Sequence, residues 1–165
     1  MKEKKLLEVG VQELRKRTAD LQTSELIQLL SRLMRFKREN KELVAYELFV
    51  RDQPEVWFSE IRESFNSELE TMNTSHPYFM KKTMRKLIRR AKTYARYAGD
   101  PAIESELFCG LLEVFNEHHL HVHPSDIVRK IYYDTFTRLE KNISKLHEDL
   151  QYDFERRLAD LSGRD

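Results

Sequence analysis

Apolar residues recur at steps of three and four along almost the whole chain, and no segment alternates convincingly at a step of two. Steps of three and four place side chains on one face of an α-helix, whereas a half-buried strand needs alternation. Turn-forming residues are also scarce, because the 165 residues include only four Gly and four Pro. A β-sandwich or barrel needs a turn about every 8–12 residues, so the sequence predicts an all-α fold.

Breaks in the apolar pattern divide the chain into about seven expected helices. Pro54, Pro77 and Pro101 suit first helical turns, Gly99 suits a helix C-cap, and Asp100 suits the N-cap before Pro101. We expect helices over residues 3–18, 24–38, 41–52, 54–72, 77–98, 101–117 and 126–161. The sequence thus predicts a single all-α domain over residues 1–165, as an irregular bundle or short helical solenoid with a long C-terminal helix.

Several features bear on the cellular setting. Cys109 is the single cysteine, and an internal disulfide needs two, so a reducing compartment is expected. Residues 1–20 carry charge throughout and lack the apolar core of a signal peptide. No apolar run approaches the 18 or so residues that span a bilayer. We therefore expect a soluble cytoplasmic protein with no membrane partner.

Charge is strongly segregated along the chain, although the formal net charge is only +1. The segment from Thr71 to Gly99 contains no acidic residue and eight basic ones. Taking these eight from the 29 Lys and Arg leaves 21 basic residues against 28 acidic ones elsewhere. The near-zero total therefore conceals one strongly basic helix over residues 77–98.

Five of the basic residues are spaced three or four apart on the side of this helix opposite its apolar stripe. These five, called the basic ridge below, are Lys82, Arg85, Arg89, Lys92 and Arg96. Tyr94 and Tyr97 lie near the end of the ridge, where they are candidates for stacking on a nucleic-acid base. Such a row of cations suits phosphate groups, so the ridge and the two tyrosines form the candidate polyanion-binding site.

Two other interpretations of the ridge remain open. Acidic residues of the neighbouring helices offer partners that would neutralise it, or it is a solvated face. The acidic candidates are Glu55, Glu60, Glu63, Glu68 and Glu70 on one helix, and Glu104, Glu106 and Glu113 on another. An acidic protein partner is a further alternative.

Residues 118–123 contain four histidines, His118, His119, His121 and His123. An extended backbone would point the last three in one direction, and short histidine-rich tracts sometimes bind metal. A structural zinc site usually has four ligands in two separated clusters, and no Cys-x-x-Cys or second histidine pair is present. We therefore favour a polar loop over a metal site or a pH-responsive loop, and expect no metal or other cofactor.

The last expected helix carries a seam of apolar residues at alternating steps of four and three, from Tyr132 to Leu150, continued by Phe154, Leu158 and Leu161. About 36 residues in one helix would measure about 54 Å, which is longer than a compact domain of this size needs. A homodimer through residues 127–161 and an intramolecular seam against the N-terminal helix are both compatible with this pattern.

The common catalytic signatures are missing from the sequence. There is no phosphate-binding Gly-x-x-x-x-Gly-Lys loop, His-Glu-x-x-His helix, Gly-x-Ser-x-Gly elbow or dinucleotide fingerprint. Cys109 lies in an apolar segment, where a buried inert thiol is expected. We expect no enzymatic activity and assign no catalytic residue.

Three segments together resemble an uncharacterised family of small all-helical bacterial proteins. They are residues 39–49, the basic helix from Pro77 to Tyr97, and residues 145–152. The resemblance implies a helical fold and a cytosolic setting, and it brings no activity, ligand or site.

The sequence accordingly favours a non-enzymatic binding or adaptor protein whose basic helix contacts a polyanion, with RNA or DNA the first candidates. The alternative is a helical protein–protein scaffold that self-associates through the C-terminal helix.

Overall fold

A computed structural model describes residues 9–163 of the chain. These residues form eight α-helices and no strand, which confirms the all-α prediction. Inter-residue contacts divide the chain into two units, one up to Ala45 and one from Tyr46 onward.

The first unit contains helices α1 (Val11–Ala19), α2 (Thr23–Phe36) and α3 (Arg38–Ala45). Residues 3–8 of the first expected helix lie outside the described part of the chain. None of the three helices has a buried residue, although α2 is strongly amphipathic. Many apolar side chains of this unit are exposed, among them Val11, Leu14, Leu26, Ile27, Leu30, Leu33 and Phe36.

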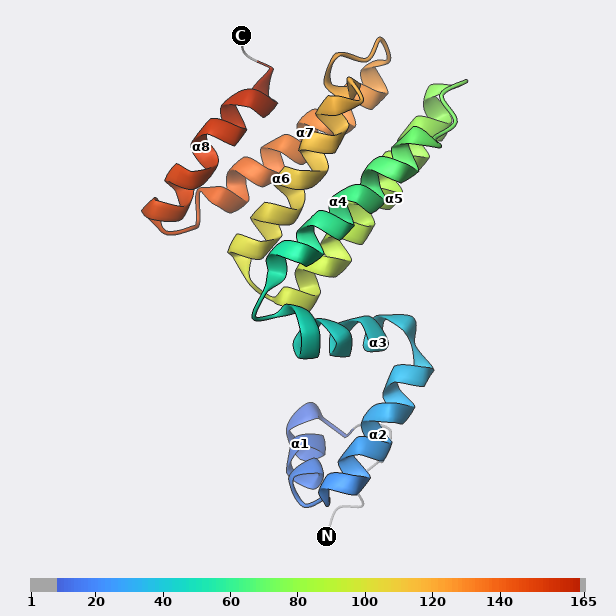
Figure 1. The fold of residues 1–165 in the computed structure, drawn as a ribbon, viewed down its shortest axis with the longest axis vertical. Coiled ribbons are helices and arrows are strands. Elements are labelled where there is room, and N and C mark those ends of the chain that lie inside the picture. The colour runs from blue at the N-terminus through green and yellow to red at the C-terminus, as the bar shows by residue number, and fades with distance from the viewer. Residues whose placement is uncertain (1–8, 164–165) are drawn as a thin grey trace. The chain divides into compact units, whose positions relative to one another are not determined.

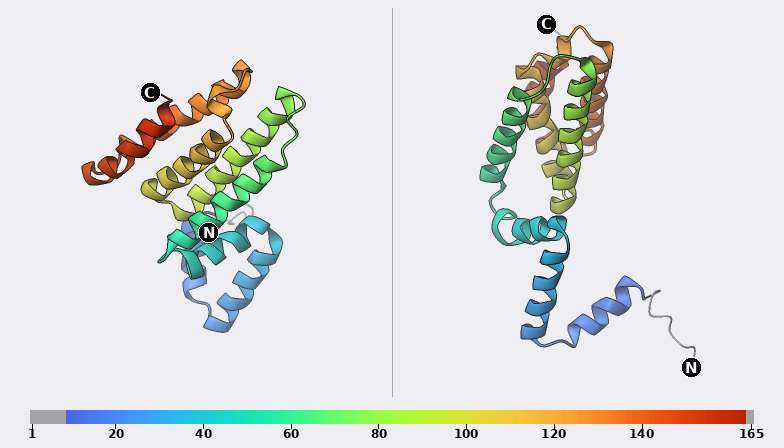
Figure 2. Two further views of the ribbon diagram at one scale, coloured as in Figure 1. Left: turned by 45° about the horizontal axis from the view of Figure 1, so that its top comes forward. Right: turned by 90° about the vertical axis from the view of Figure 1, so that its right-hand side faces the viewer.

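The second unit begins with a π-helical turn at Tyr46–Val50 and continues as a five-helix bundle. Its helices are α4 (Pro54–Glu70), α5 (Pro77–Ala98), α6 (Pro101–Glu117), α7 (Asp126–Ile143) and α8 (Glu148–Ser162). Successive helices reverse direction, so α5 and α7 run the same way, and each packs against α6 and against the other (Figure 1). Figure 2 shows α4 and α5 as a hairpin joined by the loop before Pro77.

The ends of α5 and the start of α6 follow the local sequence signals closely. The Nδ1 atom of His76 accepts a hydrogen bond from the Tyr78 N–H at 3.1 Å, beside Pro77 in the first turn. Gly99 ends α5 in the left-handed region, with φ of 62°, where a side chain would be strained. Asp100 Oδ1 then accepts from the Ala102 N–H at 2.7 Å, which caps α6.

The long C-terminal helix expected over 126–161 is wrong, because the chain reverses between Ile143 and Glu148. Helix α8 then packs against α6 and α7. This return buries Phe154 and Leu161, and the Tyr132 hydroxyl donates to the Leu161 carbonyl at 2.8 Å. Burial against the bundle therefore outweighs continuation of the helix, and the apolar seam closes within one molecule.

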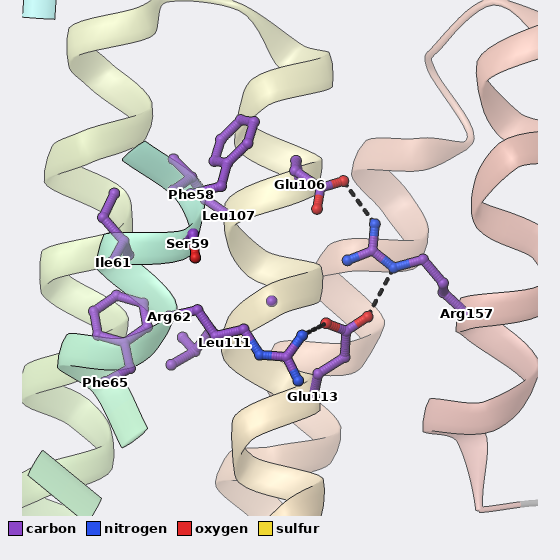
Figure 3. A pocket seen from close by; sticks show the side chains of 11 residues that line it. Phe58, Ser59, Ile61, Arg62, Phe65, Glu106, Leu107, Leu111, Glu113 and Arg157 are labelled. Carbon is purple, nitrogen blue, oxygen red and sulfur yellow. Dashed lines mark hydrogen bonds and ion pairs between the residues drawn. The ribbon is translucent and has the colours of Figure 1, made fainter. Parts of the chain in front are cut away.

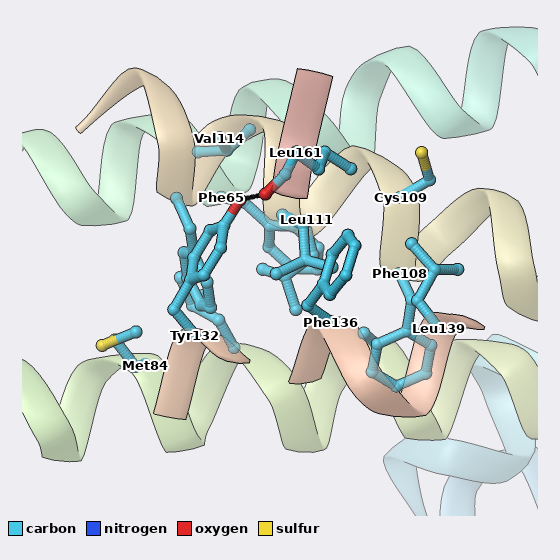
Figure 4. Close-up of a cluster of buried hydrophobic side chains, with 14 of the residues drawn as sticks. Phe65, Met84, Phe108, Cys109, Leu111, Val114, Tyr132, Phe136, Leu139 and Leu161 are labelled. Atoms are coloured by element: carbon cyan, nitrogen blue, oxygen red, sulfur yellow. Dashed lines mark hydrogen bonds between the residues drawn. The ribbon is translucent and has the colours of Figure 1, made fainter. Parts of the chain in front are cut away.

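The core lies entirely in the second unit, with α6 at its centre. Eight residues of α6 are buried, against two to seven in each of the other helices of the bundle. Phe65, Tyr132, Phe136 and Leu139 pack around it (Figure 4). This core fixes the orientation of α5, whose outward face carries the basic ridge.

Candidate nucleic-acid interface

Helix α5 presents one apolar face to the core and the basic ridge to solvent. Met84, Leu87 and Ala91 are fully buried, and α5 packs against α6, α7 and α4. All five ridge residues are exposed. They extend over about 21 Å of helix, since Lys82 and Arg96 are 14 residues apart at about 1.5 Å per residue.

The acidic residues of α4 neutralise a different part of α5. Glu68 forms ion pairs with Lys86 and with Arg90, the latter at 2.8 Å. The Arg90 guanidinium also donates to Ser64 Oγ at 2.9 Å and lies 5.3 Å from the centre of the Phe65 ring. Lys86 and Arg90 are not members of the ridge, so this pairing leaves the ridge unchanged.

The acidic residues of α6 are also paired with other cations. Glu104 accepts from Arg138 at 2.9 Å, and Glu106 accepts from Arg157 at 2.6 Å. Glu113 accepts from Arg157 at 2.7 Å and from Arg62 at 3.0 Å. Four of the acidic residues that the sequence offers as alternative partners of the ridge, Glu68, Glu104, Glu106 and Glu113, therefore have other partners.

Within residues 9–163, four ridge side chains make no hydrogen bond or ion pair: Lys82, Arg85, Arg89 and Lys92. The fifth, Arg96, donates to Thr93 Oγ1 at 3.5 Å. Like charges at steps of three and four cost a few tenths of a kcal/mol per pair. The fold thus tolerates a modest repulsion along one exposed line, and a bound anion would relieve it.

The two tyrosines predicted to stack on bases do not suit that role. Tyr97 is only 8% exposed, and the Tyr94 ring packs against Trp57 with ring centres 5.6 Å apart. Both lie on the side of α5 that faces the start of the second unit, where aromatic residues cover them. The expectation for Tyr97 is therefore wrong, and Tyr94 is half-buried among aromatic neighbours.

An exposed aromatic residue lies instead at the other end of the ridge. Tyr78 is 54% exposed and precedes Lys82 by four residues, so it continues the same line on the helix. Lys81 Nζ lies 5.3 Å from its ring centre. In the sequence, the signal for Tyr78 was its position four residues before Lys82, which places it on the same side of the helix as the ridge.

The histidine tract is not extended. Leu120–Val122 forms a 3₁₀ turn, which His119 enters with φ of 55°. His118 Nε2 bonds Asn66 Oδ1 at 2.8 Å, and burial, with a smaller contribution from His119, lowers the pKa of His121. Among the residues that the structure describes, no three His, Cys, Asp or Glu side chains are grouped to hold a metal ion.

A cleft of about 250 Å³ lies between α4, α6 and α8 (Figure 3). Its walls combine apolar side chains such as Phe58 and Ile61 with charged groups that pair with one another, Arg62 and Arg157 with Glu106 and Glu113. These pairs leave no isolated charge to attract a ligand.

Cys109 lies on α6 and is fully buried, as expected. Its Sγ atom is 3.7 Å from Glu113 Oε1, and burial raises the pKa of the thiol to about 12. The thiolate, which is the nucleophilic form, is therefore disfavoured at neutral pH.

Comparison with protein-family models, curated proteins and solved structures finds no match to the chain. The resemblance to a family of helical bacterial proteins therefore stays a prediction. In the described residues, no helix combines the length and apolar character that a bilayer span requires.

Proposed function

We propose that the chain is a non-enzymatic binding or adaptor protein whose basic ridge contacts the phosphate backbone of RNA or DNA. Lysine and arginine neutralise phosphates and release the counterions condensed on them, and arginine also donates two parallel hydrogen bonds to one phosphate. The ridge residues are the proposed contacts.

One observation carries this proposal, namely how the cations of α5 are partnered. Lys86 and Arg90 are paired with Glu68, whereas four of the five aligned ridge cations are exposed and lack an acidic partner within residues 9–163. If the ridge served only to balance neighbouring acidic helices, its cations would form ion pairs with them, as Lys86 and Arg90 do with Glu68. The difference supports an external anion.

The direct test is the affinity for labelled RNA and DNA across a salt series. Each phosphate contact contributes about 0.9 to the slope of log affinity against log salt for B-DNA, and about 0.7 for single strands. Four to five ridge contacts predict a slope of about −3 to −4.5. An affinity that does not change with salt would refute the proposal.

Arg89→Glu is expected to weaken binding at least about tenfold, because it removes one phosphate contact and adds a repulsive charge. The salt slope should shrink by about 0.7–0.9. Arg156→Glu is the matched control, since Arg156 is also an exposed arginine but lies on α8. Equal losses in the two variants would show that only total charge matters and would contradict a site on α5.

A protein–protein scaffold is the second candidate, and the exposed apolar side chains of α1–α3 favour it. A homodimer through residues 127–161 was one of two arrangements compatible with the sequence, but much of the apolar seam from Tyr132 to Leu161 is buried in the bundle. Light scattering at tens of micromolar protein tests this candidate. Salt-insensitive self-association would support it, and a strict monomer would exclude self-association as its basis.

A further inference from the structure

A hollow of about 520 Å³ lies at the C-terminal end of the ridge and connects three helices. Lys92 and Arg96 of α5, Glu104 of α6 and Arg138 of α7 all line it, together with Asp100. Asp100 is engaged as the N-cap of α6. The basic surface therefore does not end with α5, because Arg138 continues it onto a second helix.

Arg138 is held in a defined position. Its guanidinium donates to Glu104 Oε1 at 2.9 Å and lies 4.9 Å from the centre of the Phe108 ring. The bond to Glu104 engages one of the five N–H donors of the guanidinium. The Arg138 side chain is 42% exposed. A positioned and partly exposed arginine of this kind suits phosphate recognition.

A second hollow, of about 510 Å³, continues along α7 from Arg138. Lys141 and Lys145 line it, and both side chains are exposed without an ion pair in the described part of the chain. The acidic residue of this hollow, Asp134, is paired with Lys130 at 3.0 Å. Arg138 and Lys141 lie three residues apart on α7, and Lys145, two residues beyond the end of that helix, extends them into a second row of cations.

The two rows lie on helices that pack against each other, an arrangement that suits a double strand. Helices α5 and α7 pack against each other and run in the same direction (Figure 1). Packed helices lie about 8–10 Å apart, which falls between the widths of the minor and major grooves of B-DNA, about 6 and 12 Å. Cations carried by two helices whose axes lie this far apart are able to contact phosphates of both strands of one duplex.

The surface offers little for a single strand. Proteins that bind single strands without sequence preference stack successive bases on aromatic side chains. Tyr94 is packed against Trp57 and Tyr97 is buried, so the exposed Tyr78 at the far end of the ridge offers one stacking position rather than a succession of them. Contacts to phosphates therefore predominate on this surface over stacking of successive bases.

From these observations we infer that the partner is a duplex nucleic acid, bound without sequence preference, with one strand on the ridge of α5 and the other on Arg138 and Lys141 of α7 and Lys145 in the turn after it. This inference rests on the proposed function and specifies its ligand.

The test compares the full chain with its Lys141→Gln/Lys145→Gln variant. The probes are a 20-base-pair RNA duplex, a DNA duplex of the same sequence and the separated strands. The variant should bind the duplexes about tenfold more weakly and lower the salt slope by up to about 1.8, while single-strand affinity changes less than about twofold. Lys37→Gln/Lys41→Gln is the control, since it changes two exposed lysines at the same spacing in the first unit.

The outcomes separate the inference from the proposed function. If Arg89→Glu weakens binding but the α7 variant does not, or if single strands bind as tightly as duplexes, the ridge function stands and the duplex inference is overturned. If the unmodified chain binds none of the probes, the proposed function itself fails. Preference for one of the two duplexes would identify whether RNA or DNA is the natural source of the phosphates.

Discussion

Changing four ridge residues to glutamate is expected to reduce affinity for nucleic acid at least about a thousandfold. The four are Lys82, Arg85, Arg89 and Lys92. Charge-assisted hydrogen bonds contribute about 1.5–3 kcal/mol each, so losing four of them exceeds the roughly 4 kcal/mol that corresponds to a thousandfold change, even with imperfect additivity. Fluorescence anisotropy with a labelled duplex at low salt measures the effect.

The fold should survive this change, because all four side chains are exposed and make no hydrogen bond or ion pair within residues 9–163. Circular dichroism and thermal unfolding check that it does. The control replaces two lysines and two arginines of the first unit, all exposed, by glutamate: Lys16, Arg32, Arg35 and Lys41. If this control loses as much affinity as the ridge variant, net charge governs binding and the assignment to α5 is wrong.

Phe108→Ala is expected to lower the free energy of unfolding by about 3–5 kcal/mol. Phe108 is fully buried in α6 among the core side chains (Figure 4). The Arg138 guanidinium lies 4.9 Å from the centre of its ring. Truncation removes apolar burial and leaves a cavity that the surrounding helices fill only partly. For a chain of this size the midpoint of thermal unfolding should fall by about 6–20 °C.

Phe49→Ala is the matched control for this prediction. Phe49 is 81% exposed, so the same change in composition should alter the free energy of unfolding by less than about 0.5 kcal/mol. Urea titrations of both variants give the comparison. A loss below about 1 kcal/mol for Phe108→Ala would contradict the core described for the second unit.

The parts of the fold that local chemistry determines were predictable from the sequence. Proline in the first turn and glycine at the C-cap define α5 as Pro77–Ala98, the same bounds as those expected. The helical period likewise placed the ridge residues on the exposed side of the helix. Both predictions depend only on residues that are close together in the chain.

The parts that failed depend on contacts between distant residues. No glycine or proline marks the reversal after Ile143, and the gain that drives it comes from burying Phe154 and Leu161 on other helices. Similarly, the period gives the side of α5 on which Tyr94 and Tyr97 lie, but it does not reveal that Trp57 packs there. The packing of α4 also decides that Glu68 forms ion pairs with Lys86 and Arg90 and not with the ridge residues.

The return of α8 onto the bundle has a consequence for how the chain is made. The Leu161 carbonyl, which accepts from the Tyr132 hydroxyl, is synthesised 29 residues after that tyrosine. Ribosomes add about 5–20 residues per second, so α4–α7 emerge seconds before the helix that completes their packing. During that interval the apolar surface of α6 and α7 that α8 later covers is open to water.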